Sequence, residues 1–130
     1  MMRTILTAAA ASVVLAGSAA YAHHSYAATY DVTHEIKLEG KIVQFVYRNP
    51  HSFVHVTTNE KGESQRWAVE WSGTTQLNNA GVNKESLKVG DLVVITARPS
   101  RVAGEFRALM LTLKRPSDGF TWGSPGQQVD

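Results

Sequence analysis

Hydrophobic and polar residues alternate with a period of two over much of the chain after residue 35, which predicts β-strands. In residues 65–72 the alternation places large apolar side chains on one face and polar or small ones on the other: Trp67, Val69 and Trp71 against Arg66, Ala68 and Glu70. Residues 36–48 also alternate, but the parity of the apolar positions changes after Gly40. Such a phase change is typical of a long strand that is bulged and strongly bent.

Five strands and one short helix are expected in all. The strands are predicted over residues 36–48, 51–58, 65–72, 92–100 and 106–114. The helix is predicted within residues 73–81, capped by Thr74 or Thr75 and ended by Gly81. A long bent first strand and a helix between the third and fourth strands follow the order of an OB-fold, a five-stranded Greek-key barrel. The predicted fold class is therefore all-β and OB-fold-like, with another small barrel or a sandwich as the alternative.

The first 22 residues have the three parts of a secretory signal peptide. Arg3 gives a positive start, residues 5–20 are uncharged and rich in alanine, and Ala20 and Ala22 occupy the small-residue positions of a cleavage site. The uncharged run is shorter than the ~20 residues that a membrane span requires. We expect cleavage after Ala22, with cleavage after Ala20 as the alternative. The exported protein then has no stable membrane anchor, and its predicted location is the periplasm or the cell exterior.

The chain is accordingly divided into four parts: a signal peptide (1–22), an N-terminal arm (23–35), the OB-like barrel (36–115) and a flexible tail (116–130). After the signal peptide, 12 Lys and Arg residues stand against 11 Asp and Glu residues, and the positive charges are scattered. Nucleic-acid-binding domains concentrate positive charge on one face, so nucleic acid is not expected as a partner. The chain has no cysteine, which excludes disulfides, thiol catalysis and cysteine-ligated zinc.

The histidines are the candidate metal ligands, and all five precede residue 56. If the mature chain begins at His23, its free amine and its imidazole Nδ1 can chelate one Cu(II), and a second imidazole would complete a histidine brace. His51 follows the Asn49-Pro50 pair that ends the preceding strand pattern, and it is the first choice for that second imidazole. His24 and His55 are auxiliary candidates in the same hypothetical copper site.

Structural roles for these histidines are the competing interpretation. His51 can hydrogen-bond the Asn-Pro turn, and His55 can lie half-exposed on its strand. Four residues along a strand span about 13 Å, so the two side chains cannot share one ion without a bulge. The copper hypothesis therefore depends on whether the N-terminal arm reaches His51.

Other residues offer weaker candidates. Alternating aromatic residues can form a core or a platform on which bases or sugars stack, and the core is the favoured interpretation: Phe45, Tyr47, Phe53, Trp67 and Trp71. Glu70 and Glu39 can form an acid pair, although a solvated or salt-bridged pair is the default interpretation. Ser25 and Ser52 lie beside histidines without the Gly-x-Ser-x-Gly context of a nucleophile. No catalytic constellation is recognised, so an enzyme is not expected.

Four motifs occur together in one order: HHSYAATYD at 23–31, GKIVQFVYRNPH at 40–51, WAVEWSG at 67–73 and ESLKVGDLVVI at 85–95. In this combination the chain resembles an uncharacterised family of small exported bacterial proteins, catalogued as a domain of unknown function. The resemblance extends over the mature chain up to about Lys114. It implies export and a compact β-barrel, and it implies no particular activity.

These observations predict a non-enzymatic, exported binding domain. Cu(II) held by His23 and His51 is the first candidate ligand. A metal-free domain that binds an envelope protein is the alternative, and a copper-dependent oxidase that uses the same ligands is a third interpretation.

Overall fold

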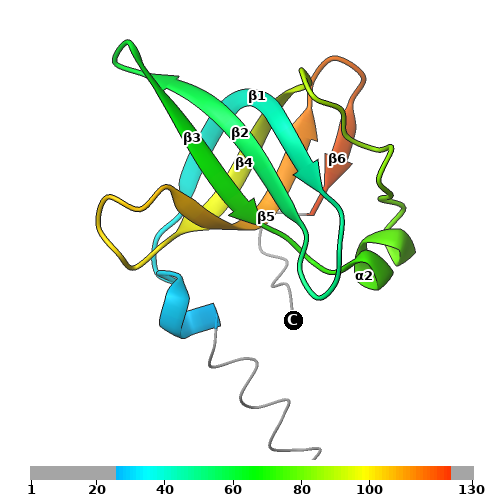
Figure 1. Ribbon diagram of the computed structural model, residues 1–130, viewed down its shortest axis with the longest axis horizontal. Coiled ribbons are helices and arrows are strands. Elements are labelled where there is room, and N and C mark those ends of the chain that lie inside the picture. The colour runs from blue at the N-terminus through cyan, green and yellow to red at the C-terminus, as the bar shows by residue number, and fades with distance from the viewer. Residues whose placement is uncertain (1–25, 124–130) are drawn as a thin grey trace, which may run out of the picture.

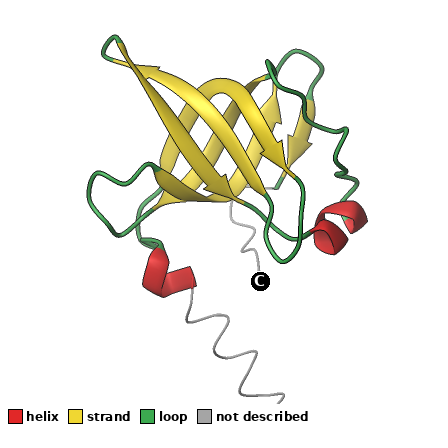
Figure 2. Ribbon diagram, viewed as in Figure 1, coloured by secondary structure: helices red, strands yellow, loops and turns green. Residues whose placement is uncertain are grey.

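Six strands form one sheet that curls into a barrel (Figure 1). The computed structural model describes residues 26–123, so the predicted signal peptide, His23 and His24 lie outside the described residues. The strands are β1 (Ile36–Val46), β2 (Phe53–Glu60), β3 (Glu63–Glu70), β4 (Leu92–Pro99), β5 (Arg107–Arg115) and β6 (Phe120–Trp122). Helix α2 (Thr74–Asn79) follows β3, and a single helical turn spans residues 26–29. Figure 2 shows both helical segments below the barrel.

The strand order is that of an OB-fold. Neighbouring strands follow the order β3-β2-β1-β4-β5-β6, and a parallel pairing between β3 and β5 closes the first five into a barrel. Strand β1 pairs antiparallel with both β2 and β4, because it is long enough to bend from one side of the barrel to the other. The predicted all-β, OB-fold-like barrel with a helix between the third and fourth strands is therefore confirmed.

The bend of β1 coincides with a bulge. The pairing of β1 with β2 shifts register between Ile42 and Gln44, which leaves Val43 as the extra residue. Just before the bulge, β1 passes so close to β2 that a Cβ atom on Gly40 would lie 2.4 Å from the carbonyl oxygen of Thr57. The phase change in the sequence thus marks a true bulge, and glycine is required there by the close approach of the neighbouring strand.

The core fills the barrel with alternate side chains from its strands. Trp71 is 2% exposed, and its ring lies 6.0 Å from that of Phe45 and 5.0 Å from that of Trp122. The remaining buried apolar residues come from the five barrel strands, from α2 and from the segment that follows it: Leu38, Ile42, Val54, Val56, Val69, Leu77, Val82, Leu87, Val93, Ile95, Ala97, Ala108, Met110 and Leu113. Burial of this set supplies the main driving force for folding.

Helix α2 is capped differently from the prediction. Its N-cap residue is Gly73 rather than a threonine, and the amide of Thr74 donates to Oδ1 of Asn49 at 2.9 Å. A Cβ atom on Gly73 would lie 2.6 Å from the carbonyl oxygen of Pro50, so glycine lets the loop before β2 approach the helix. The oxygen that caps the Thr74 amide thus comes from a distant loop, whereas the Gly73 amide donates to Oε1 of Gln76 within the helix at 3.3 Å. Gly81, with a φ of 80°, follows the helix as predicted.

Regular structure continues into the segment that the sequence predicts as a flexible tail. Strand β6 pairs with the end of β5, and Arg115 holds the intervening turn through an ion pair with Asp118 of 2.8 Å. Trp122 then packs edge-on against Trp71. Three residues are too few to give a periodic signal after Pro116, which explains why the pattern does not predict the strand. In the described part of the chain, no helix is long and apolar enough to cross a membrane.

Candidate functional site

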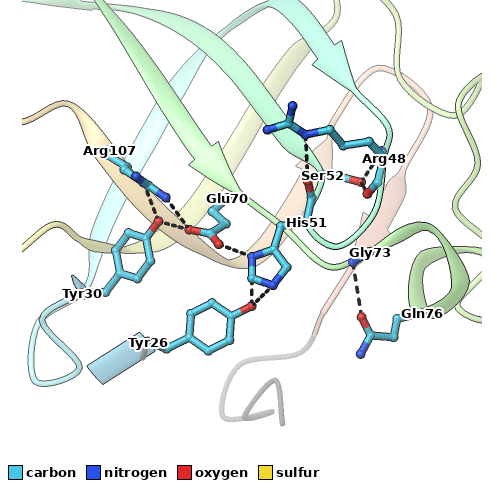
Figure 3. A network of polar contacts seen from close by, with 9 residues as sticks. All are labelled: Tyr26, Tyr30, Arg48, His51, Ser52, Glu70, Gly73, Gln76 and Arg107. Atoms are coloured by element: carbon cyan, nitrogen blue, oxygen red, sulfur yellow. Dashed lines mark hydrogen bonds and ion pairs between the residues drawn. The ribbon is translucent and has the colours of Figure 1, made fainter. Parts of the chain in front are cut away.

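Four segments that are far apart in the sequence meet at one end of the barrel (Figure 3). The N-terminal arm contributes Tyr26 and Tyr30, and the loop between β1 and β2 contributes His51. Glu70 ends β3 and Arg107 begins β5. The parallel pairing of β3 with β5 brings those two strand ends together, so the closure of the barrel sets the position of the site. These five residues are called the Glu70 cluster below.

Glu70 is the centre of the cluster. Its side chain is 7% exposed, and both carboxylate oxygens accept hydrogen bonds. Oε2 accepts from the Tyr30 hydroxyl and from Nη2 of Arg107, the latter at 3.0 Å. Oε1 accepts from Nδ1 of His51, and Nε of Arg107 donates to the Tyr30 oxygen at 2.9 Å. A carboxylate can be buried at tolerable cost when its oxygens are satisfied by charged and neutral donors in this way.

The surroundings of Glu70 keep it ionised. Burial alone would raise the pKa of this carboxyl, but hydrogen bonds from Tyr30, His51 and Arg107 outweigh burial and lower the pKa below its ordinary value. Tyr30 is affected in the opposite direction, because burial and its hydrogen bond to Glu70 raise the pKa of the phenol. The proton therefore stays on Tyr30 and the negative charge stays on Glu70.

Contacts at both ring nitrogens orient His51. A carboxylate only accepts hydrogen bonds, so Nδ1 carries the hydrogen that bonds to Glu70. Nε2 lies 3.1 Å from the hydroxyl of Tyr26, and the two rings stack with centroids 5.5 Å apart. In the neutral imidazole, Nε2 then holds a lone pair that accepts from the Tyr26 hydroxyl. Because the side chain of His51 is 38% exposed, the ring can be reached from solvent.

The N-terminal arm is attached to the barrel by hydrogen bonds of its own. Tyr30 is 1% exposed and forms a β-bridge with Ser100. Further along the same loop, Nε of Arg101 donates to the carbonyl oxygen of Ala27 at 2.6 Å. The arm is therefore a docked part of the fold from Tyr26 onward, and it reaches His51.

The series Tyr26, His51, Glu70 has the order of a nucleophile, a base and an acid. Tyr26 is a poor nucleophile at neutral pH, because burial and then the negative charge of Glu70 raise the pKa of its phenol. Ser52 is engaged elsewhere: it is buried, and its hydroxyl donates to the carbonyl oxygen of Arg48 at 3.2 Å. The arrangement offers instead an imidazole that is anchored through Nδ1 and whose Nε2 lone pair can coordinate a metal ion in place of its hydrogen bond from Tyr26.

The predicted ligands His51 and His55 have different neighbours. His51 belongs to the Glu70 cluster, whereas His55 lies on β2 with its ring 6.4 Å from that of Phe53. Burial and the positive charge of Arg66 lower the pKa of His55. Since the two rings face different surroundings, the auxiliary role assigned to His55 gains no support from its position.

His34, the remaining histidine in the described part of the chain, lies outside the Glu70 cluster. His34 is exposed and pairs with Asp31 at 2.7 Å. His23 and His24 lie outside the described residues, so their predicted role as ligands stays a prediction. Within residues 26–123, no group of three or more His, Asp or Glu side chains is placed to hold a metal ion.

Glu39 and Glu70 have separate partners: Glu39 lies in a surface ion pair, as the default interpretation expects, whereas Glu70 is buried in the Glu70 cluster. Glu39 pairs with Lys37 at 2.8 Å on the surface of β1, where both side chains are 65% exposed. The aromatic candidates are mostly core residues, because Trp71 is buried and three others pack against the core: Phe45, Tyr47 and Trp67. Phe53 is different, since it lies beneath the guanidinium groups of two arginines.

Sequence reasoning missed three members of the cluster: Tyr26, Tyr30 and Arg107. Tyr26 and Tyr30 are four residues apart, a spacing that places side chains on one face of a helical turn. A helical turn predicted in the arm would have paired them. Arg107 gives no such local signal, because its partners lie in β3 and in the arm.

The raised pKa of Tyr30 predicts a loss of stability in alkali. An unfolded tyrosine ionises near pH 10, whereas Tyr30 keeps its proton to higher pH in the folded chain. Above about pH 10 the unfolded state releases this proton first, so stability falls as pH rises. We expect Tyr30→Phe to be less stable than wild type at pH 7, and the difference between them to shrink above about pH 10. Urea unfolding from pH 7 to 11 measures this, and a constant difference would contradict it.

Comparison with known proteins gives a family and a structural similarity. The model of a family of unknown function, DUF6152, matches residues 10–108. No curated protein matches the chain. Among solved structures, the chain is similar to the crystal structure of Rim1, a mitochondrial single-stranded DNA-binding protein from S. cerevisiae, with 14% identity and a TM-score of 0.47. That alignment covers 62% of this chain and 91% of the other.

The Rim1 match corrects one expectation. The exclusion of nucleic acid as a partner class is wrong as stated, because a protein similar to this chain binds single-stranded DNA. A net charge near zero does not exclude such a partner, because it averages over the whole surface and does not give the charge of any one face. Arg48 and Arg107, which are distant in sequence, lie over the same ring of Phe53. At this identity and TM-score the match itself assigns no ligand to the chain.

Proposed function

Because the chain belongs to the family of unknown function DUF6152, we propose its function from the site itself: it is an exported, non-enzymatic domain that binds Cu(II) at His51. One observation supports this proposal above the others. Nδ1 of His51 is anchored on the buried carboxylate of Glu70, so Nε2 can coordinate a metal ion that displaces the Tyr26 hydroxyl, which lies 3.1 Å away. Metal-ligating histidines commonly donate their other ring N–H to a carboxylate, which fixes the tautomer and raises the basicity of the ligand.

The start of the mature chain is proposed to supply the remaining nitrogen ligands. Tyr26 contacts His51, and three residues of extended chain span about 10 Å. An N-terminal His23 is therefore within range of an ion at Nε2 of His51. Its amine and imidazole nitrogens suit Cu(II), the most tightly bound divalent ion of the first-row series. His24 is an auxiliary donor in this proposal.

Export is part of the proposal, because the amine of His23 exists only after cleavage behind Ala22. Intact mass of the protein recovered from the periplasm tests this step. A mass for residues 23–130 supports the proposal. A chain that begins at Tyr21, or one that keeps residues 1–22, contradicts it.

Copper affinity measured on the mature exported protein tests the ligands. We expect His51→Ala to weaken Cu(II) binding by about 100-fold or more, because one nitrogen donor is lost. Glu70→Gln is expected to weaken it by about 10- to 100-fold, because a neutral amide oxygen replaces the charged acceptor of the Nδ1 hydrogen. Competition titration against a chelator of known Cu(II) affinity gives both values.

His55→Ala is the matched control, since it removes a histidine from the same segment of chain but outside the cluster. Its affinity should equal that of wild type. Equal affinities in His51→Ala and His55→Ala would overturn the assignment of His51. Retention of an envelope partner by His51→Ala in the presence of chelator would favour the metal-free interaction domain instead.

A further inference from the structure

A hollow of about 310 Å³ opens on the outer face of the barrel, beside the Glu70 cluster. Its lining comes from β1, β2, β3, β5 and the loop between β1 and β2, and it includes the polar side chains of Gln44 and His55. Val46, Phe53 and Ala68 are apolar, and Arg48 and Arg107 are cationic. A concave surface that joins an apolar patch to a few convergent polar groups is the usual form of a small-molecule site.

Two guanidinium groups converge on one aromatic ring in this hollow. Cζ of Arg48 and Cζ of Arg107 each lie 5.6 Å from the centroid of Phe53. Figure 3 shows the two arginines reaching from opposite sides of the view. Cation–π contacts of this length hold a guanidinium in place without neutralising its charge. Arg107 is also paired with Glu70 at 3.0 Å, so the positive charge that remains to be balanced is that of Arg48.

The two arginines differ in how many of their guanidinium N–H groups already donate hydrogen bonds within the protein. Arg107 is committed to Glu70 and to Tyr30 through Nη2 and Nε. Arg48 donates only Nε, to the carbonyl oxygen of His51 at 3.3 Å, and has no carboxylate partner among the described residues. No described Asp or Glu lines the hollow either. The planar fork of Arg48 is thus available to an acceptor that enters from solvent.

We propose that this hollow binds a small organic anion with a planar apolar body. The anionic group accepts hydrogen bonds from the free N–H groups of Arg48, while the guanidinium of Arg107, paired with Glu70, lies over the same ring of Phe53. The planar body lies against Phe53 and Ala68. Guanidinium groups bind carboxylate and phosphate groups through paired hydrogen bonds, so either group satisfies the site. The hollow has the volume of about ten water molecules, which is enough for a single-ring acid.

This site does not use Nε2 of His51, so failure of the copper proposal would leave the anion proposal unaffected, and the reverse also holds. Its test is run on the full mature chain in the presence of EDTA, which removes copper from the outcome. Benzoate serves as the probe because it has one ring and one carboxylate. Benzyl alcohol, which has the ring without the charge, is its matched control.

We expect benzoate to shift the backbone amide resonances of Phe53 and Ala68, with a Kd on the order of 1–10 mM for so small a ligand. Benzyl alcohol is expected to bind at least about tenfold more weakly. Arg48→Gln should weaken benzoate binding about tenfold, and Arg48→Lys should recover part of the loss. Lys84→Gln removes the same charge outside the lining and should leave the affinity unchanged.

Equal binding of benzoate and benzyl alcohol would overturn the proposal, because the charge would then play no part. An unchanged Kd in Arg48→Gln would also overturn it. Phe53→Leu provides a second variant that keeps the lining apolar, and it too should weaken benzoate binding while the melting temperature shows that the chain is folded.

Phenyl phosphate distinguishes the two sources of anionic group. Tighter binding of phenyl phosphate than of benzoate at the same amides supports the site and assigns it to a phosphate. The reverse order supports the site and assigns it to a carboxylate. A thymidine oligonucleotide that shifts amides over the whole face of β1, β2 and β3, and that benzoate fails to displace, overturns the small-molecule proposal in favour of a nucleic-acid surface.

Discussion

Glu70→Ala is expected to lower the free energy of unfolding by about 2–4 kcal/mol, because the substitution leaves three donors without their acceptor. The unpaired Tyr30 hydroxyl accounts for the largest part of this loss, because Tyr30 is 1% exposed and its hydroxyl cannot hydrogen-bond to water instead. His51 and Arg107 are 38% and 39% exposed, so hydration offsets part of their loss. For a domain of this size the melting temperature should fall by roughly 10–20 °C. Urea unfolding and calorimetry measure the two quantities.

Glu39→Ala is the control for Glu70→Ala. It also removes a carboxylate from an ion pair on a strand, but both partners of that pair are 65% exposed. Such surface pairs contribute little, and we expect a change within about 0.5 kcal/mol. Similar effects of the two substitutions would mean that the Glu70 cluster is not a structural centre of this end of the barrel.

Trp71→Ala should lower the free energy of unfolding by about 3–5 kcal/mol, the usual cost of removing a large buried side chain. Trp71 is 2% exposed and joins β1 to β6 through its contacts with Phe45 and Trp122. Its loss opens a cavity that these two rings cannot fill while they remain on paired strands. Chemical unfolding followed by circular dichroism, a probe that does not depend on the missing tryptophan, measures the change.

Trp67→Ala is the comparison for Trp71→Ala, because it removes the same side chain from within β3, whereas Trp71 directly follows that strand. Trp67 is only partly buried and packs edge-on against Phe106, which is itself 42% exposed. A smaller loss of about 1–2 kcal/mol is expected, in line with the smaller area buried. A larger effect at Trp67 than at Trp71 would contradict the placement of the core.

The fold could be predicted because a barrel buries one side of each strand. Apolar residues therefore recur at every second position of a strand, as do Trp67, Val69 and Trp71. The bulge in β1 is visible for the same reason, since an extra residue changes the parity of the apolar positions. Strand β6 and the cap of α2 leave no such trace. The first is too short, and the second is an oxygen of Asn49 that arrives from another loop.

The site could be predicted only in part. His51 is predicted as a site residue because it follows the Asn-Pro pair that ends a strand. Glu70 is not, because it lies on the polar face of β3. That face is expected to meet solvent. Instead Tyr30 and Arg107 cover it, and each arrives through a long-range contact that only the closed barrel creates. The converging arginines of the hollow were missed for the same reason, since charge that is scattered along the chain gathers on one face in space.

The orientation of the His51 ring is the point on which the account depends most directly. Long-range ¹H–¹⁵N correlation spectra of the mature, copper-free chain report which ring nitrogen carries hydrogen in the neutral imidazole. We predict hydrogen on Nδ1, directed at Glu70, and a bare Nε2 beside Tyr26, with this preference lost in Glu70→Ala. Hydrogen on Nε2 with a bare Nδ1 would contradict the anchored donor from which the proposed function is argued.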